Sequence, residues 1–166
     1  MEEVVKEVVK KEALRLFTYG LYAVTTGDAD HWNAFTANWL SQVSFEPPLI
    51  VLSVDNTAVS LPIIRASQHF AVHVYSAEQR DLSGLLGKSF AKHPEKLDGL
   101  RTQIGETGCP VLLDTLAWVE CSVENEMAAG DSTLVLGRVV AAHVQVHGQA
   151  QGEPLTMRAA GFRHAG

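Results

Sequence analysis

The feature that most constrains the fold is a succession of β segments in which strands follow one another without intervening crossover helices. Strands are predicted, from β-branched and aromatic runs bounded by turn residues, over residues 20–26, 32–44, 49–54, 70–75, 116–125 and 132–146. Parallel sheets need a strand–helix–strand alternation, which is missing. The pattern therefore favours a mainly β fold, a small closed β-barrel with short helices.

The chain has the length of one domain, which we predict over residues 1–166. An amphipathic helix is predicted over residues 1–18, because Val5, Val8 and Val9 recur at helical spacing. Valine lowers the intrinsic stability of a helix, so this one needs packing. We expect it to lie on the protein's own core, with a partner subunit as the alternative.

Two further helices are predicted inside the β pattern. The first begins at Leu61 or Pro62 with Ser60 as its cap and ends near residue 67. The second follows a capping box over residues 76–79 and ends at Gly87. Residues 88–110 lack periodicity and are predicted to form a surface excursion that can shape a pocket.

Charge and motifs exclude several function classes. A net charge of −6 gives no general affinity for nucleic acid or an anionic membrane surface, and the first residues lack the apolar run of a targeting segment. His143 and His147 would share a strand face about 13 Å apart, too far for one ion, so no metal site is expected. Cys109 and Cys121 lack a metal or disulfide spacing, which suits a reducing cytoplasm.

The segment over residues 33–60 carries the strongest functional signal. Thr36 and Asn38 fall on one face of a strand, where they can meet a ligand or face solvent. The loop with Asn56, Thr57 and Ser60 brings amide and hydroxyl donors to the start of a helix, where unpaired N–H groups attract phosphate. An ordinary turn followed by a helix cap is the alternative interpretation.

The order of several motifs resembles the flavin reductase-like family of FMN-binding split barrels. The motifs are T-A-N-W at 36–39, F-E-P-P-L at 45–49, S-V-D-N-T-A-V-S at 53–60, G-D-S at 130–132 and G-F-R at 161–163. The resemblance implies a Greek-key split barrel and a homodimer with two FMN sites at the subunit interface.

The resemblance also implies which residues form the site. Those implied to bind the cofactor are Asn33, Thr36, Ala37, Asn38, Trp39, Ser53, Val54, Asp55, Asn56, Thr57, Ser60 and Arg163. Ser132 and Phe162 are implied to contact the substrate. No side chain is assigned as catalytic, because the flavin carries the chemistry. The chain departs from the family at Ser132 and Leu61, where relatives carry histidine.

The implied activity is that of an NAD(P)H-dependent flavin reductase. Hydride would pass from NADH or NADPH to bound FMN, or to FAD, and electrons would leave to free flavin or a redox protein. The replaced histidines keep open a different class, a flavoredoxin-like FMN electron carrier reduced by a protein partner. A related barrel that binds haem or a deazaflavin is a third possibility.

Overall fold

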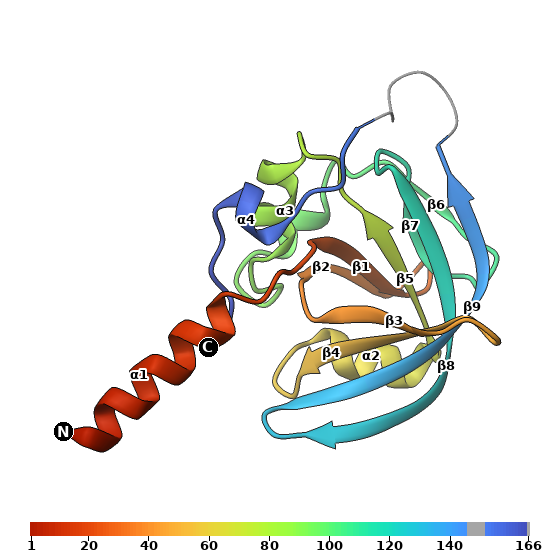
Figure 1. Ribbon diagram of the computed structural model, residues 1–166. Coiled ribbons are helices and arrows are strands. Elements are labelled where there is room, and N and C mark those ends of the chain that lie inside the picture. Colours follow the sequence, from red (N-terminus) through yellow and green to blue (C-terminus); the bar gives the residue numbers. More distant parts are fainter. Residues whose placement is uncertain (146–151, 166) are drawn as a thin grey trace.

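A computed structural model describes residues 1–145 and 152–165, and its centre is a curled antiparallel sheet (Figure 1). The seven strands lie in the order β2-β1-β5-β8-β9-β4-β3. Their bounds are β1 Tyr22–Gly27, β2 Trp32–Ala37, β3 Leu40–Ser44, β4 Leu49–Asp55, β5 His69–Val74, β8 Ala117–Ala129 and β9 Ser132–Val144. The predicted mainly β barrel is confirmed.

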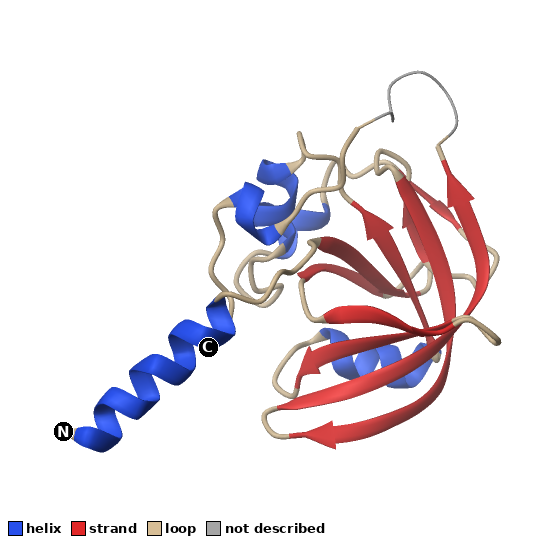
Figure 2. Cartoon of the chain, in the orientation of Figure 1, coloured by secondary structure: helices blue, strands red, loops and turns tan. Residues whose placement is uncertain are grey.

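Helices and a second pair of strands lie beside this sheet, apart from the N-terminal helix, which projects away from it (Figure 2). The helices are α1 Glu2–Arg15, α2 Ser60–Ser67, α3 Arg80–Leu86, α4 Met157–Ala160 and the 3-10 helix η1 Pro94–Leu97. Two more strands, β6 Thr102–Ile104 and β7 Pro110–Leu112, pair as a separate ribbon. The predicted surface excursion over residues 88–110 thus contains η1 and β6. Among the described residues, no helix is long and apolar enough to cross a membrane.

The predicted single strand over residues 32–44 is wrong, and the reason matters for the site. The chain leaves β2 after Ala37 and enters β3 at Leu40, so only Asn38 and Trp39 separate the strands. β2 forms one edge of the sheet and β3 forms the opposite edge. The Trp39 carbonyl accepts a hydrogen bond of 2.9 Å from the Ser53 amide, which fixes the junction to β4.

Two apolar clusters hold the barrel together. One fills the barrel interior and includes Leu52, Phe70 and Val135, all fully buried. Gly137 on β9 makes room for this cluster, because a Cβ there would lie 2.5 Å from the Phe70 ring. The second cluster joins the barrel to α3 and α4 through residues that include Tyr75, so both helices are anchored to the sheet.

The N-terminal helix differs from its predicted packing. No residue of α1 is buried, and the helix projects away from the barrel (Figure 1). Its valines at positions 4, 5, 8 and 9 are 49–66% exposed. The expectation that the helix lies on its own core is therefore wrong, and the partner-subunit alternative stays a prediction.

Both predicted internal helices exist but begin differently. The Ser60 hydroxyl does not cap α2; Val59 takes the cap position. α3 begins at Arg80, because the Gln79 side chain accepts a 2.9 Å hydrogen bond from the Ser76 amide and closes a turn before the helix. The end of α3 at Gly87 agrees with the prediction.

A buried histidine ties β5 to its neighbours. His73 Nδ1 donates to the Ala23 carbonyl at 3.1 Å, and Nε2 accepts from the Leu112 amide at 3.0 Å. This pair of partners requires a neutral ring, because a proton on Nε2 would face an N–H donor. Burial lowers the pKa of His73 to about 4, with the hydrogen bond to Ala23 opposing the shift.

We predict that His73 makes the fold acid-sensitive. A histidine with a lowered pKa binds protons in the unfolded chain first, so its stabilisation is complete above about pH 6.5 and declines toward pH 4. Between pH 7.5 and 4.5 the wild type should lose about 2 to 3 kcal/mol more unfolding free energy than His73→Gln. Urea unfolding at both pH values measures this difference. Equal losses would contradict the assignment.

Candidate functional site

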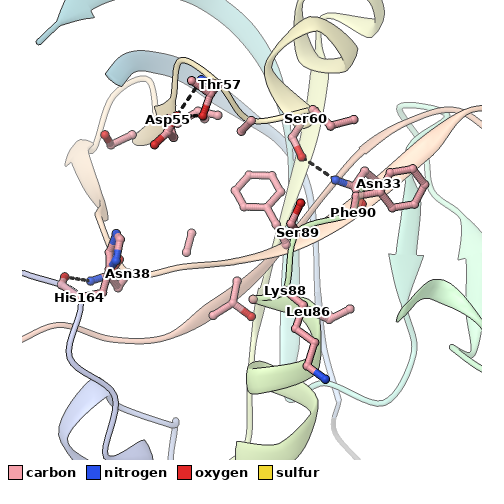
Figure 3. Close-up of a pocket in the computed structure, with 18 of the residues that line it drawn as sticks. Asn33, Asn38, Asp55, Thr57, Ser60, Leu86, Lys88, Ser89, Phe90 and His164 are labelled. Atoms are coloured by element: carbon pink, nitrogen blue, oxygen red, sulfur yellow. Dashed lines mark hydrogen bonds between the residues drawn. The ribbon is translucent and has the colours of Figure 1, made fainter. Parts of the chain in front are cut away.

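A cavity of about 530 Å³ opens where β2 ends, facing the β4–α2 loop and the segment after α3 (Figure 3). The residues that line it are Asn33, Phe35, Thr36, Ala37, Asn38, Trp39, Ser53, Val54, Asp55, Thr57, Ala58, Val59, Ser60, Leu86, Gly87, Lys88, Ser89, Phe90, Ala91, Lys96, Asp131, Ser132 and His164. Eleven of the fourteen residues implied by the sequence motifs are in this set; Asn56, Phe162 and Arg163 are not.

The β4–α2 loop is held by its own side chains. Asp55 Oδ1 accepts hydrogen bonds from the Thr57 hydroxyl at 2.6 Å and the Thr57 amide at 2.7 Å. These two bonds, the hydroxyl first, keep the pKa of Asp55 below its usual value. Both Thr57 donors are therefore used within the loop, and the loop presents the Asp55 carboxylate to the cavity.

Asn56 turns away from the cavity toward the β8–β9 hairpin. Its Nδ2 donates to the Gly130 carbonyl at 3.3 Å, and its Oδ1 accepts from the Thr133 hydroxyl at 2.7 Å. Asn56 thus positions the loop by tying it to the hairpin. Ser132, in the same hairpin, lines the cavity and donates to Asp131 at 3.2 Å.

Asn33 brings an unsatisfied polar atom to the cavity wall. Its Nδ2 donates to the Ser60 hydroxyl at 2.8 Å, while its Oδ1 is buried without a partner among the described residues. Turning the amide over would leave Nδ2 unpartnered instead. An unpaired buried polar atom costs about 1 to 3 kcal/mol, and a ligand that hydrogen-bonds it removes that cost.

The β2 residues meet the C-terminal segment and α3. Asn38 Nδ2 donates to the His164 carbonyl at 2.9 Å, and the Trp39 and His164 rings lie 5.1 Å apart between centroids. Thr36 Oγ1 donates to the Ser83 carbonyl at 2.6 Å and accepts from the Tyr75 hydroxyl at 2.9 Å. The Thr36 hydroxyl therefore makes its hydrogen bonds within the protein.

Sequence reasoning missed one whole wall of the cavity. Residues 86–91, Lys96, Asp131 and His164 line it without having been assigned. Figure 3 shows Ser89 facing Ser60 across the cavity. The available signal for this wall was the sequence Lys88-Ser89-Phe90, which directly follows the glycine that ends α3. It lies in a segment without periodicity.

The Lys96 side chain holds residues 86–91 of this wall in place. The side chain is buried, and its Nζ donates to the Leu86 carbonyl at 3.0 Å and the Lys88 carbonyl at 2.8 Å. The Leu86 carbonyl belongs to the last residue of α3 and the Lys88 carbonyl follows two residues later, at the helix end where the dipole favours a cation. Burial lowers the pKa of Lys96 to about 8, so the side chain stays protonated at neutral pH.

The two remaining implied residues lie elsewhere. Phe162 packs against the cluster that joins α3 and α4 to the barrel, with the Arg80 guanidinium 5.4 Å above its ring. Arg163 lines a second cavity, at the end of α1. In residues 1–145 and 152–165, no three His, Cys, Asp or Glu side chains come close enough to hold a metal ion.

An antiparallel barrel split between its edge strands, with a polar and partly cationic cavity at the split, defines a cofactor-binding split barrel. The chain belongs to the flavin reductase like domain family, whose sequence model matches residues 14–166.

Individual relatives agree with this assignment. The chain is 33% identical to FMN reductase (NADH) SmoA of Agrobacterium fabrum, over 92% of this chain and 82% of that protein. It is also 33% identical to the high molecular weight rubredoxin of Moorella thermoacetica, over 87% of this chain and 62% of that protein. Among solved structures, NADH:FAD oxidoreductase SgcE6 of Streptomyces globisporus matches with a TM-score of 0.79 and 26% identity, over 96% of this chain and 86% of that one.

The matched proteins differ in length. The chain spans 62%, 49% and 56% of three curated relatives, namely that rubredoxin, a probable flavin reductase and the reductase subunit Stc3 of stachydrine N-demethylase, the last two from Rhizobium meliloti.

We predict that Lys96→Met destabilises the protein. The buried Leu86 carbonyl and the partly buried Lys88 carbonyl would lose their donor, which lowers the unfolding free energy by about 1 to 3 kcal/mol. The control is Lys92→Met, on the same segment but exposed, which should change it by less than about 0.5 kcal/mol. Denaturant unfolding compares the two, and an unchanged Lys96→Met variant would count against the wall-fixing role.

Proposed function

We propose that this chain is an FMN-binding flavoprotein that acts as an NAD(P)H-dependent flavin reductase. The observation that carries the proposal is the cavity at the split of the barrel, with the unpartnered Asn33 amide in its wall. Support also comes from the names of relatives, which include FMN reductase (NADH) and NADH:FMN oxidoreductase. A solved structure of SgcE6 is a complex with NAD and FAD fragments.

The residues present suit a flavin nucleotide. A volume of about 530 Å³ lies within the usual range of cofactor sites, roughly 300 to 1,000 Å³. The walls combine flat apolar groups, Trp39 and Phe90, with hydroxyl, amide and ammonium donors. FMN needs the same combination, since it joins a flat ring to a hydroxylated chain and a phosphate.

The charges in the cavity suggest how the ligand is oriented. Asp55 is an acceptor for ribityl hydroxyl groups, while Lys88 lies with Ser89 on the opposite wall and can neutralise a phosphate. Ser60 and Asn33 complete a set of neutral partners. We therefore assign the phosphate to the wall after α3 rather than to the Asp55 carboxylate.

A bound flavin would supply the redox chemistry, as the acceptor of a hydride and the source of the electrons that leave. The chain binds and orients the ring between the β2 end and the wall after α3. Trp39 and the C-terminal segment cover one side of the cavity, which limits access of water. No side chain is assigned to move a proton.

A second candidate is an FMN electron carrier that a protein partner reduces. Ser132 favours it, because this cavity-lining position lacks the imidazole that the family resemblance implies there. The similarity to a high molecular weight rubredoxin points the same way. In the reductase the electrons would pass to free flavin, and in the electron carrier they would pass to a redox protein.

Three further assignments belong to the proposal. Residues 1–166 form one flavin reductase-like domain, and two copies form a homodimer, which the exposed valines of α1 support. The protein works in the cytoplasm, where Cys109 and Cys121, both buried and free, stay reduced.

Anaerobic absorption spectra test the function. FMN is added to the purified protein, followed by NADH and then NADPH. Flavin that binds and bleaches within seconds supports the reductase and names its donor. Bound flavin that stays oxidised with both donors favours the carrier, and a protein that binds no flavin overturns both.

We predict that Asn33→Ala weakens FMN binding about 5- to 30-fold, which corresponds to one lost hydrogen bond of about 1 to 2 kcal/mol. Fluorescence titration of FMN measures the affinity. Asn125→Ala, an exposed asparagine on β8, is the control and should bind FMN as the wild type does. Unchanged affinity in Asn33→Ala would remove the amide from the site.

A further inference from the structure

Lys96 places a positive charge inside the protein, among uncharged partners. The residue is 1% exposed and lines the cavity at the split of the barrel. Its Nζ is held by the carbonyls of Leu86 and Lys88, and no carboxylate lies within 4.0 Å of it in the described ranges, 1–145 and 152–165. A buried charge is costly unless an opposite charge meets it, so Lys96 favours an anionic ligand in this cavity.

Other charged groups around Lys96 do not supply that partner. Those on the neighbouring segments are paired with each other or exposed; they are His93 and Glu95 (3.0 Å apart), Arg80 and Asp81 (3.9 Å apart), Lys92 and Asp98. Those that line the rest of the cavity are Lys88, Asp55, Asp131 and His164. Burial, rather than a neighbouring charge, therefore lowers the pKa of Lys96 to about 8.

The wall after α3 offers N–H and O–H donors to a ligand. The Ser89 carbonyl accepts from the amides of Lys92 at 3.2 Å and His93 at 2.9 Å, so a turn begins at Ser89. Within this turn the amides of Phe90 and Ala91 donate to no acceptor in the part of the chain that the structure describes, and both residues line the cavity. Backbone amides beside a serine hydroxyl suit a phosphate.

The position of this wall at the end of a helix would by itself oppose a phosphate. Carbonyl groups at a helix C-terminus carry a partial negative charge. Here the carbonyls of Leu86 and Lys88 are turned toward Lys96 Nζ, and the ammonium outweighs their partial charge. Because Lys96 is buried, its charge acts more strongly than that of Lys88, which is exposed and screened by salt.

We propose that Lys96 is the buried counter-charge of the ligand's phosphate, and that its proton controls the affinity of the cavity for a phosphorylated flavin. The inference rests on the proposed flavin function and on the phosphate's place at the wall after α3. Lys96 is a positioning residue, which acts on the ligand through this wall. The phosphate in turn favours the charged ammonium, so binding raises the pKa of Lys96 above its value of about 8 in the free protein. The affinity is therefore full below pH 8 and falls as the pH rises through 8.

Fluorescence titration of FMN and riboflavin between pH 7 and pH 9 tests this coupling. The Kd of FMN should rise about fivefold to tenfold over this range, because free Lys96 loses its proton. Riboflavin has the same ring and ribityl chain without the phosphate, and its Kd should stay within about twofold. The phosphate of FMN is itself ionised throughout, since its second pKa is about 6.

Three variants separate the charge of Lys96 from its hydrogen bonds and from its neighbours. Lys96→Gln removes the charge but keeps an amide that can donate to both carbonyls. It should bind FMN about tenfold more weakly than the wild type at pH 7, with no further change up to pH 9. Lys88→Gln should weaken FMN binding and keep the pH dependence. The matched control, Lys92→Gln, is exposed on the same segment and should bind FMN as the wild type does at each pH.

The inference is overturned if FMN binds equally well at pH 7 and pH 9, if riboflavin shows the same change, or if Lys96→Gln keeps the pH dependence. In each of these cases FMN still binds, so the proposed function stands. A wild type that binds neither flavin would overturn the proposed function and this inference with it. The comparison of FMN with riboflavin on the wild type keeps the test decisive if Lys96→Gln does not fold.

Discussion

The structure depends on one constraint, the two-residue connection between opposite edges of the sheet. β2 and β3 follow each other in the chain, yet five strands lie between them in the sheet. Only Asn38 and Trp39 join them, so the sheet must curl until its edges meet. The two edge strands are not paired with each other in the sheet, and the cavity lies where β2 ends at this connection. Barrel closure and site formation are therefore one event.

Buried polar groups then fix the walls of that opening. Thr36 joins β2 to Tyr75 and to the Ser83 carbonyl in α3, and Lys96 joins η1 to the end of the same helix. Each of these groups is satisfied within the scaffold, so the walls are set before any ligand arrives. Asn33 is different, because its amide keeps one atom unpaired at the cavity. The scaffold thus separates groups that hold the site from a group that can bind.

The sequence predicts the barrel well because alternation and turn residues act locally. The strands over 20–26, 49–54 and 70–75 agree with β1, β4 and β5 within two residues at each end. The break at Asn38 and Trp39 could not be found this way, because a strand's departure from one sheet edge leaves no periodic signal. Likewise the wall after α3 depends on a buried lysine ten residues from its carbonyl partner.

Side-chain partners are the other part that sequence reasoning did not reach. Asn56 and Thr57 were predicted as phosphate donors because of residue type and position. Neither prediction could anticipate that Asp55 accepts both Thr57 hydrogen bonds, or that Thr133 and Gly130 hydrogen-bond the Asn56 side-chain amide.

The β4–α2 loop consequently offers the Asp55 carboxylate to the cavity, and its lowered pKa keeps it charged at neutral pH. A phosphate beside that charge would be repelled, whereas hydroxyl groups would be bound. A second lining carboxylate, Asp131, lies beside this loop, because its backbone carbonyl accepts from the Asn56 amide at 3.0 Å. The cations that line the cavity, Lys88 and Lys96, belong to the opposite wall. The charges therefore favour an orientation in which a hydroxylated phosphate ligand would have its hydroxyl groups at Asp55 and its phosphate at the opposite wall.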